Sequence, residues 1–219
     1  MQIITYLIDL ILHMDVHLTE LISQFGGWTY LILFLVIFIE TGIVIFPFLP
    51  GDSLLFAAGA LAALTGSPLN IVFLWVLMAI AAILGDSVNY SIGKFIGPKA
   101  FTSNSRWLKR EYLEQAQAFY KKHGRITIFL ARFIPIIRTF APFVAGIGEM
   151  PYGYFISYNI FGGVFWTAMF TFGGYFFGNL AFVKENFSLV VIAIIIISVI
   201  PAVVEVVKAK RKPAAPIAE

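Results

Sequence analysis

The sequence predicts an all-α polytopic membrane protein, built as an inverted repeat. We expect two opposed re-entrant helical hairpins, several transmembrane helices and one cytoplasmic amphipathic helix. Three observations predict this fold. Hydrophobic residues make up 60% of the 219 residues and charged residues only 12%, against about 25% charged residues in soluble domains. Basic residues gather in two clusters beside apolar runs, and prolines interrupt two of those runs. A single membrane domain over residues 1–219 is expected, with no separate soluble domain.

The first half of the chain contains two predicted spans on either side of a broken run. Residues 3–24 are apolar but carry several polar side chains, which predicts a helix that is interfacial or partly inserted and stays in the mature protein. Residues 28–45 and 70–96 are long enough to cross a bilayer, which needs about 17–25 residues. Between them, residues 46–68 begin with FPFLPGDS and continue with LLFAAGALAAL, an apolar run too short to cross.

The second half follows a similar order. Residues 103–123 are charged and amphipathic, which predicts a helix on the cytoplasmic surface. Residues 126–148 are apolar again but are interrupted by two prolines and two arginines. Residues 152–180 and 187–207 are predicted spans, and a basic cytoplasmic tail, 208–219, follows them.

The positions of the basic residues predict the topology. They form one cluster in residues 94–125 and one in the tail: Lys94, Lys99, Arg106, Lys109, Arg110, Lys121, Lys122 and Arg125, then Lys208, Lys210, Arg211 and Lys212. Basic loops stay in the cytoplasm, and we favour this orienting role over a phosphate-binding patch. Counting spans back from the tail then leaves both ends of 126–148 inside and both ends of 46–68 outside. Each segment must enter and return, and broken backbone at membrane depth must be buried in protein or line a watery cavity.

A weak internal repeat agrees with this topology. Phe46-Pro47 matches Ile134-Pro135, and Ala58-Gly59 matches Ala145-Gly146. After each hairpin, the pattern Gly93-x-x-x-Gly97 recurs as Gly174-x-x-x-Gly178. Hairpin and span therefore occur twice in the same order, as in secondary transporters, whose sites lie near the midplane between two repeats.

Five ionisable residues in apolar surroundings are the candidate functional residues: Glu40, Asp52, Asp86, Arg132 and Arg138. A charge at the bilayer centre costs at least about 2.5–3.5 kcal/mol, so these groups must pair or face water and substrate. The arginines are predicted to bind an anionic phosphate headgroup, and the carboxylates to carry protons. The alternative is a set of buried ion pairs that hold the hairpins together. For Asp86 both readings are equally favoured.

Several other functions are disfavoured. The chain has no cysteine, its histidines at 13, 17 and 123 are scattered, and none belongs to an HExxH motif. We therefore expect no metal and no cofactor. No serine has a paired base, so the protein is not expected to be an enzyme. The basic residues flank membrane spans rather than form a separate domain, which gives nucleic-acid binding no support.

Four motifs carry a resemblance to a known family: FIETG at 38–42, FLPGDSLLF at 48–56, GDSVNYSIG at 85–93 and ARFIPIIRTFAPFVAGIG at 131–148. With these motifs the sequence resembles the DedA family of bacterial inner-membrane proteins, which shares its core with eukaryotic lipid scramblases of the VTT type. The resemblance covers nearly the whole chain and implies two opposed re-entrant hairpins. It also implies that Glu40, Asp52, Arg132 and Arg138 are functionally required.

The resemblance further implies a flippase in the bacterial inner membrane, which returns undecaprenyl phosphate or a related anionic lipid to the inner leaflet with the proton motive force. Its partners would be that lipid and protons or another coupling ion, and the pattern is compatible with a homo-oligomer. A proton/cation antiporter, a passive phospholipid scramblase and an assembly scaffold that docks through residues 103–123 remain alternatives.

Overall fold

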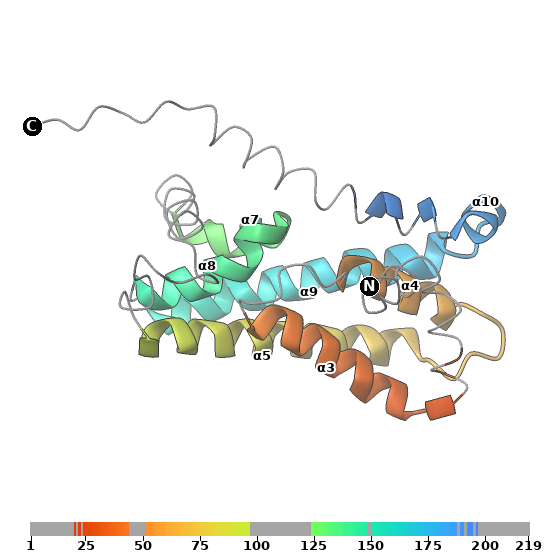
Figure 1. Cartoon of the computed structure of the whole chain (residues 1–219), viewed down its shortest axis with the longest axis horizontal. Helices are drawn as coiled ribbons and strands as arrows, with labels where there is room; N and C mark the ends of the chain where they lie inside the picture. The colour runs from red at the N-terminus through yellow and green to blue at the C-terminus, as the bar shows by residue number, and fades with distance from the viewer. Residues whose placement is uncertain are drawn as a thin grey trace, which may run out of the picture.

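Figure 1 shows the protein as a computed structural model, which describes residues 20, 22, 24–43, 51–96, 124–148, 150–187, 189–190, 192–194 and 196. Every regular element in these residues is helical: α3 (Trp28–Gly42), α4 (Gly51–Ala62), α5 (Ile71–Ile96), a 3-10 turn (Gly124–Ile126), α7 (Thr127–Ala131), α8 (Pro135–Ile147), α9 (Tyr152–Phe177) and α10 (Ala181–Glu185). The all-helical prediction is confirmed for this part of the chain.

Several predicted segments lie outside the described residues. They are most of the first helix, residues 44–50 with the end of the first span and the start of the first hairpin, the amphipathic helix at 103–123 with most of its basic cluster, the end of the last span and the basic tail. The three histidines lie outside as well.

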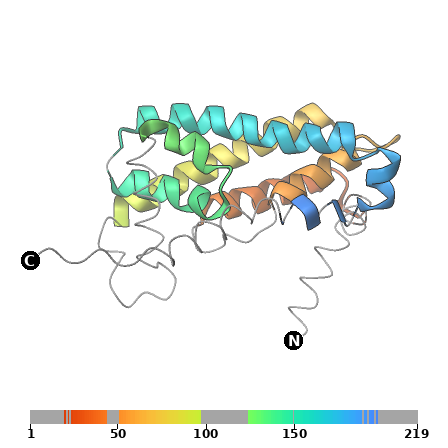
Figure 2. The ribbon, with the colours of Figure 1, turned by 90° about the horizontal axis from the view of Figure 1, so that it is seen from above.

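Two helices, α5 and α9, form the frame of the molecule. Each has 26 residues and is apolar enough to cross a membrane. At 1.5 Å per residue such a helix is about 39 Å long, more than the roughly 30 Å of a hydrocarbon core. The two helices pack together and run antiparallel along most of the described part of the molecule (Figures 1 and 2). Both predicted spans are thereby found as single long helices.

Helix α3 is shorter than predicted. It ends at Gly42, and Ile43 is already extended, with φ −116° and ψ 113°. Its 15 residues span only about 22 Å. Helix α3 packs on α5, where a Cβ on Gly42 would lie 3.4 Å from the Cα of Gly85. The described helix therefore ends within an apolar run, three residues before the end predicted for the span.

Helix α5 is apolar on its exposed face and holds polar groups on its buried face, the opposite of a helix on the surface of a soluble protein. Large apolar side chains are exposed at every fourth position: Val72, Val76, Ile80, Leu84, Val88 and Ile92. The buried face carries mostly small residues beside a few large apolar ones, and it also holds the polar side chains of Asp86 and Asn89. An apolar stripe of this kind suits a lipid environment, and it leaves the polar groups for the interior.

Helix α4 lies against α9 through glycines that bring the two backbones into contact. A Cβ on Gly59 would overlap the carbonyl of Thr171, and a Cβ on Gly174 would overlap the carbonyl of Phe56. Small residues permit this close approach between helices in a membrane.

Helix α8 lies against α5 in the same way. A Cβ on Gly146 would overlap the carbonyl of Tyr90, and a Cβ on Gly93 would overlap the carbonyl of Phe143. The two residues on α8 lie 87 positions after their counterparts on α4, and the two on α5 lie 81 positions before theirs on α9. The two glycine seams are thus built from matching positions.

The predicted broken run at 126–148 contains two helices, α7 and α8, which contact each other. Between them, residues 132–134 form a turn that ends with Ile134 extended, at φ −124° and ψ 103°. Pro135 then opens α8, a position that suits proline because its N–H is not needed there. Pro142 lies inside α8 and has no N–H to offer the carbonyl of Arg138 four residues earlier. The chain is interrupted where the sequence indicates.

Candidate functional site

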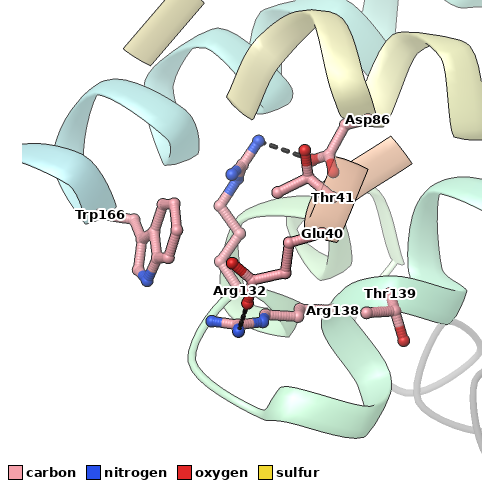
Figure 3. Close-up of a pocket in the computed structure, with 7 residues that line it drawn as sticks. All are labelled: Glu40, Thr41, Asp86, Arg132, Arg138, Thr139 and Trp166. Carbon is pink, nitrogen blue, oxygen red and sulfur yellow. Dashed lines mark hydrogen bonds and ion pairs between the residues drawn. The ribbon is translucent and has the colours of Figure 1, made fainter. Parts of the chain in front are cut away.

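A small cavity of about 10 Å³ collects four of the five predicted residues. Its walls are Glu40, Thr41, Asp86, Arg132, Arg138, Thr139 and Trp166, shown in Figure 3. These side chains come from α3, α5, α8, α9 and the turn before α8. The fifth predicted residue, Asp52, lies beside the cavity and pairs with Arg138.

Arg138 is shared between two carboxylates. Its Nη1 donates to Asp52 Oδ1 at 2.7 Å, and its Nη2 donates to Glu40 Oε1. The Arg138 side chain is 9% exposed and that of Glu40 is 1% exposed. Asp52 and Arg138 are far apart in the sequence, and the structure brings them together as an ion pair.

The start of α4 holds the two carboxylates at Arg138. Asp52 is in the first turn of α4, where the helix dipole favours an anion. Gly51 faces the Glu40 carboxylate so closely that a Cβ at position 51 would overlap it. The glycine of the PGDS sequence therefore leaves the space that Glu40 occupies.

Trp166 is a site residue that the sequence reasoning missed. Its indole Nε1 donates to Asp52 Oδ1 at 2.9 Å, and its ring centroid lies 5.3 Å from Arg138 Cζ, within cation–π range. The indole is 2% exposed. Tryptophans of membrane proteins prefer the interfaces, so a tryptophan near the middle of a predicted span was the available signal.

Arg132 belongs to a second group. Its Nη2 donates to Asp86 Oδ2 at 2.6 Å and also to the side-chain oxygen of Asn159. Asn159 in turn donates to the carbonyl of Ile83 at 3.0 Å. Figure 3 shows the Arg132 guanidinium pointing toward Asp86 and away from Arg138. Both arginines line one cavity, but each has its own partners.

Asn89 braces the backbone on both sides of the cavity. Its Nδ2 donates to the carbonyl of Thr41 at 3.2 Å and to that of Thr139 at 2.8 Å. These carbonyls directly follow Glu40 and Arg138 in the chain, so one fully buried amide ties the two segments that carry this ion pair.

The charges do not cancel. Three carboxylates and two guanidinium groups leave one excess negative charge when all five are ionised. That excess lies on the Arg138 side, since Asp86 and Arg132 neutralise each other. Glu40 Oε2 and Arg132 Nε have no hydrogen-bond partner among the described residues. No group of three histidine or acidic side chains in those residues is arranged to hold a metal ion.

Fold and site together define a helical membrane protein with a buried cluster of arginines and carboxylates. Residues 49–176 match the model of the VTT domain. The chain is 54% identical to the DedA protein of Escherichia coli K12 over 212 residues, which cover 96% of this chain and 97% of the relative. The chain therefore belongs to the DedA family of VTT-domain membrane proteins.

More distant relatives agree. An uncharacterised membrane protein of Mycobacterium tuberculosis H37Rv is 45% identical, over 81% of this chain and 78% of that protein. The inner membrane protein YqjA of Escherichia coli K12 is 34% identical, over 70% of this chain and 69% of that protein. No solved structure matches the chain.

Proposed function

We propose that this protein is a flippase of the bacterial inner membrane. It moves undecaprenyl phosphate or a related anionic lipid between the leaflets, coupled to protons and with no chemical step. The inner membrane is named for a relative, YqjA. The observation that carries the proposal is the single guanidinium of Arg138 held between two buried carboxylates.

This arrangement couples proton binding at the carboxylates to phosphate binding at the Arg138 guanidinium. A guanidinium binds a carboxylate and a phosphate through the same planar donors. While Glu40 and Asp52 are ionised, they occupy those donors. Protonation of either carboxylate removes the ion pair between that carboxylate and Arg138. A phosphate can then bind the guanidinium donors that become free. When the proton leaves, the carboxylate displaces the phosphate.

The proposed path of the lipid follows from the topology. We propose that residues 46–68 and 126–148 are re-entrant hairpins from opposite faces, that the chain is multi-pass and that its C-terminus is cytoplasmic. The two matching glycine seams support an inverted repeat in which each hairpin helix packs on the long helix of the other half. Rocking of one half against the other would open the site to each leaflet in turn, while the lipid tail stays in the bilayer.

Transfer of fluorescent undecaprenyl phosphate between leaflets of proteoliposomes tests this function. With an imposed pH gradient, the wild type is expected to transfer the lipid faster than without one. Arg138→Ala is expected to lose both lipid binding and transfer, and Glu40→Gln to lose the response to the gradient. Lipid binding unchanged in Arg138→Ala would contradict the assignment.

A proton/cation antiporter is the second candidate, since the excess negative charge beside Arg138 also suits a small cation. It predicts ion-driven proton flux in vesicles without the anionic lipid. Transfer of lipid that ignores the gradient would instead indicate a passive scramblase.

A further inference from the structure

We propose that Arg132, Asp86 and Asn159 form a clasp that positions Arg138 and does not bind the headgroup. This inference rests on the proposed function, because it assigns the lipid phosphate to Arg138 alone. It also divides the five predicted residues into two groups with different roles: Arg132 with Asp86, and Arg138 with Glu40 and Asp52.

The clasp is electrically balanced. One guanidinium meets one carboxylate, Asp86, at 2.6 Å, and the carbonyl and amide oxygens of Asn159 accept from the same Nη2. Both ionic side chains are at most 6% exposed. A buried pair whose charges already cancel has no excess charge to attract a proton or an anion.

The surface of α9 is shaped around Arg132. A Cβ on Gly162 would lie 2.9 Å from Arg132 Cδ and 3.0 Å from its Nε, and a Cβ on Gly163 would lie 3.4 Å from its Nη2. The two glycines receive the side chain of Arg132, which leaves the guanidinium little room to turn toward a ligand.

The clasp lies next to the break that sets the direction of α8. Arg132 is the first residue of the turn, and the amide of Arg138 donates to the carbonyl of Ile134, the last residue of that turn, at 2.8 Å. Holding Arg132 against α5 and α9 therefore fixes where α8 begins. Arg138 is in the first turn of α8, so fixing the start of α8 also positions the Arg138 guanidinium.

The Arg138 group has the opposite properties. Two carboxylates compete for one guanidinium. Its charge is therefore unbalanced, and exchange of a proton or an anion would balance it. This contrast is why we place exchange at Arg138 and support at Arg132.

Single substitutions do not separate the two roles, because removing one partner of a buried pair strands the other charge. Replacing both partners of an ion pair by neutral residues in one chain does separate the two roles. Arg132→Gln and Asp86→Asn are each expected to lower the melting temperature and to slow lipid transfer by about tenfold or more. Combined in one chain, they leave two amides that can bond each other. We expect the combined variant to regain the wild-type melting temperature and transfer within about threefold of wild type.

The matched pair is Arg138→Gln with Glu40→Gln. This combination also removes one positive and one negative charge from the same cavity. We expect it to recover only part of the melting temperature lost in Arg138→Gln alone, because Asp52 stays without its arginine, and not to bind or transfer the lipid. Recovery of transfer here, or a folded Arg132→Gln/Asp86→Asn protein without transfer, would overturn the division of roles.

A second measurement separates positioning from general destabilisation and does not depend on the paired variant folding. Asn159→Ala keeps the ion pair but removes its brace, and should raise the KM for the lipid several-fold. Arg138→Lys should also raise this KM. If the clasp acts through Arg138, the two effects are expected to be non-additive, because sites that act independently give additive effects. Additive effects would contradict positioning, whereas a wild type that moves no lipid would overturn the proposed function itself.

Discussion

Asp52 depends on two donors that arrive from different helices. The Arg138 guanidinium and the Trp166 indole both donate to its Oδ1. A carboxylate buried at this depth is tolerated only when such donors replace its water. The indole is therefore as much a part of the site as the arginine.

Trp166→Phe tests this dependence, because it keeps an aromatic ring over Arg138 and removes only the indole donor. A hydrogen bond to a charged group contributes about 1.5–3 kcal/mol, against about 0.5–1.5 for a neutral one. Trp75 is the matched control, since its indole donates to the neutral carbonyl of Val164 at 3.3 Å. We expect Trp166→Phe to lower the free energy of unfolding more than Trp75→Phe and to weaken lipid binding. Equal losses, with binding unaffected in both, would contradict a role for the indole.

Gly51→Ala tests whether the space at the start of α4 sets the position of Glu40. The new Cβ would overlap the Glu40 carboxylate and push it away from Arg138, so we expect lipid affinity to rise, because Glu40 then competes less with phosphate for the guanidinium. Gly153→Ala is the control, because it is also near the start of a helix and a Cβ there has no neighbour within 4 Å. Unchanged affinity in Gly51→Ala would show that Glu40 has room to move.

The sequence allowed the charged residues of this site to be predicted but not their pairing. Glu40, Asp52, Asp86 and both arginines stand out because ionised groups in an apolar run carry a large insertion cost. Which carboxylate meets which arginine depends on helix packing, and no spacing along the chain encodes it. The uncharged partners Trp166 and Asn159 carry no such cost and gave little signal.

At the scale of elements, the two glycine seams decide how closely the broken helices approach the long ones. The glycine pattern was visible in the sequence. The all-helical fold and both long helices could also be predicted from the sequence, through its hydropathy. The early end of α3 could not be predicted, because its apolar run continues past Gly42.

Gly59→Ala and Gly146→Ala are expected to destabilise the protein by similar amounts. Each Cβ would overlap a backbone carbonyl of the facing helix, which a rotamer change cannot relieve, and overpacking of this kind costs about 1–3 kcal/mol. Unfolding in mixed SDS micelles measures the loss, and Gly153→Ala again gives the baseline for a glycine with open space. If only one of the two substitutions were costly, the seams would not be equivalent.

At the scale of the whole molecule, the excess negative charge of the site predicts how many protons accompany each lipid. One proton neutralises the cluster and frees one of the two Arg138 donors that the carboxylates occupy, so we expect one proton per lipid. With the membrane potential clamped at zero, a gradient of about one pH unit then supports at most about a tenfold ratio of lipid between the leaflets, since about 1.4 kcal/mol corresponds to tenfold. Fluorescence quenching of the labelled lipid from outside measures this ratio. Reversing the gradient should reverse the accumulation, because a coupled carrier responds to the sign of its driving force. A ratio that stays at one under either gradient would show that the protein equilibrates lipid without coupling.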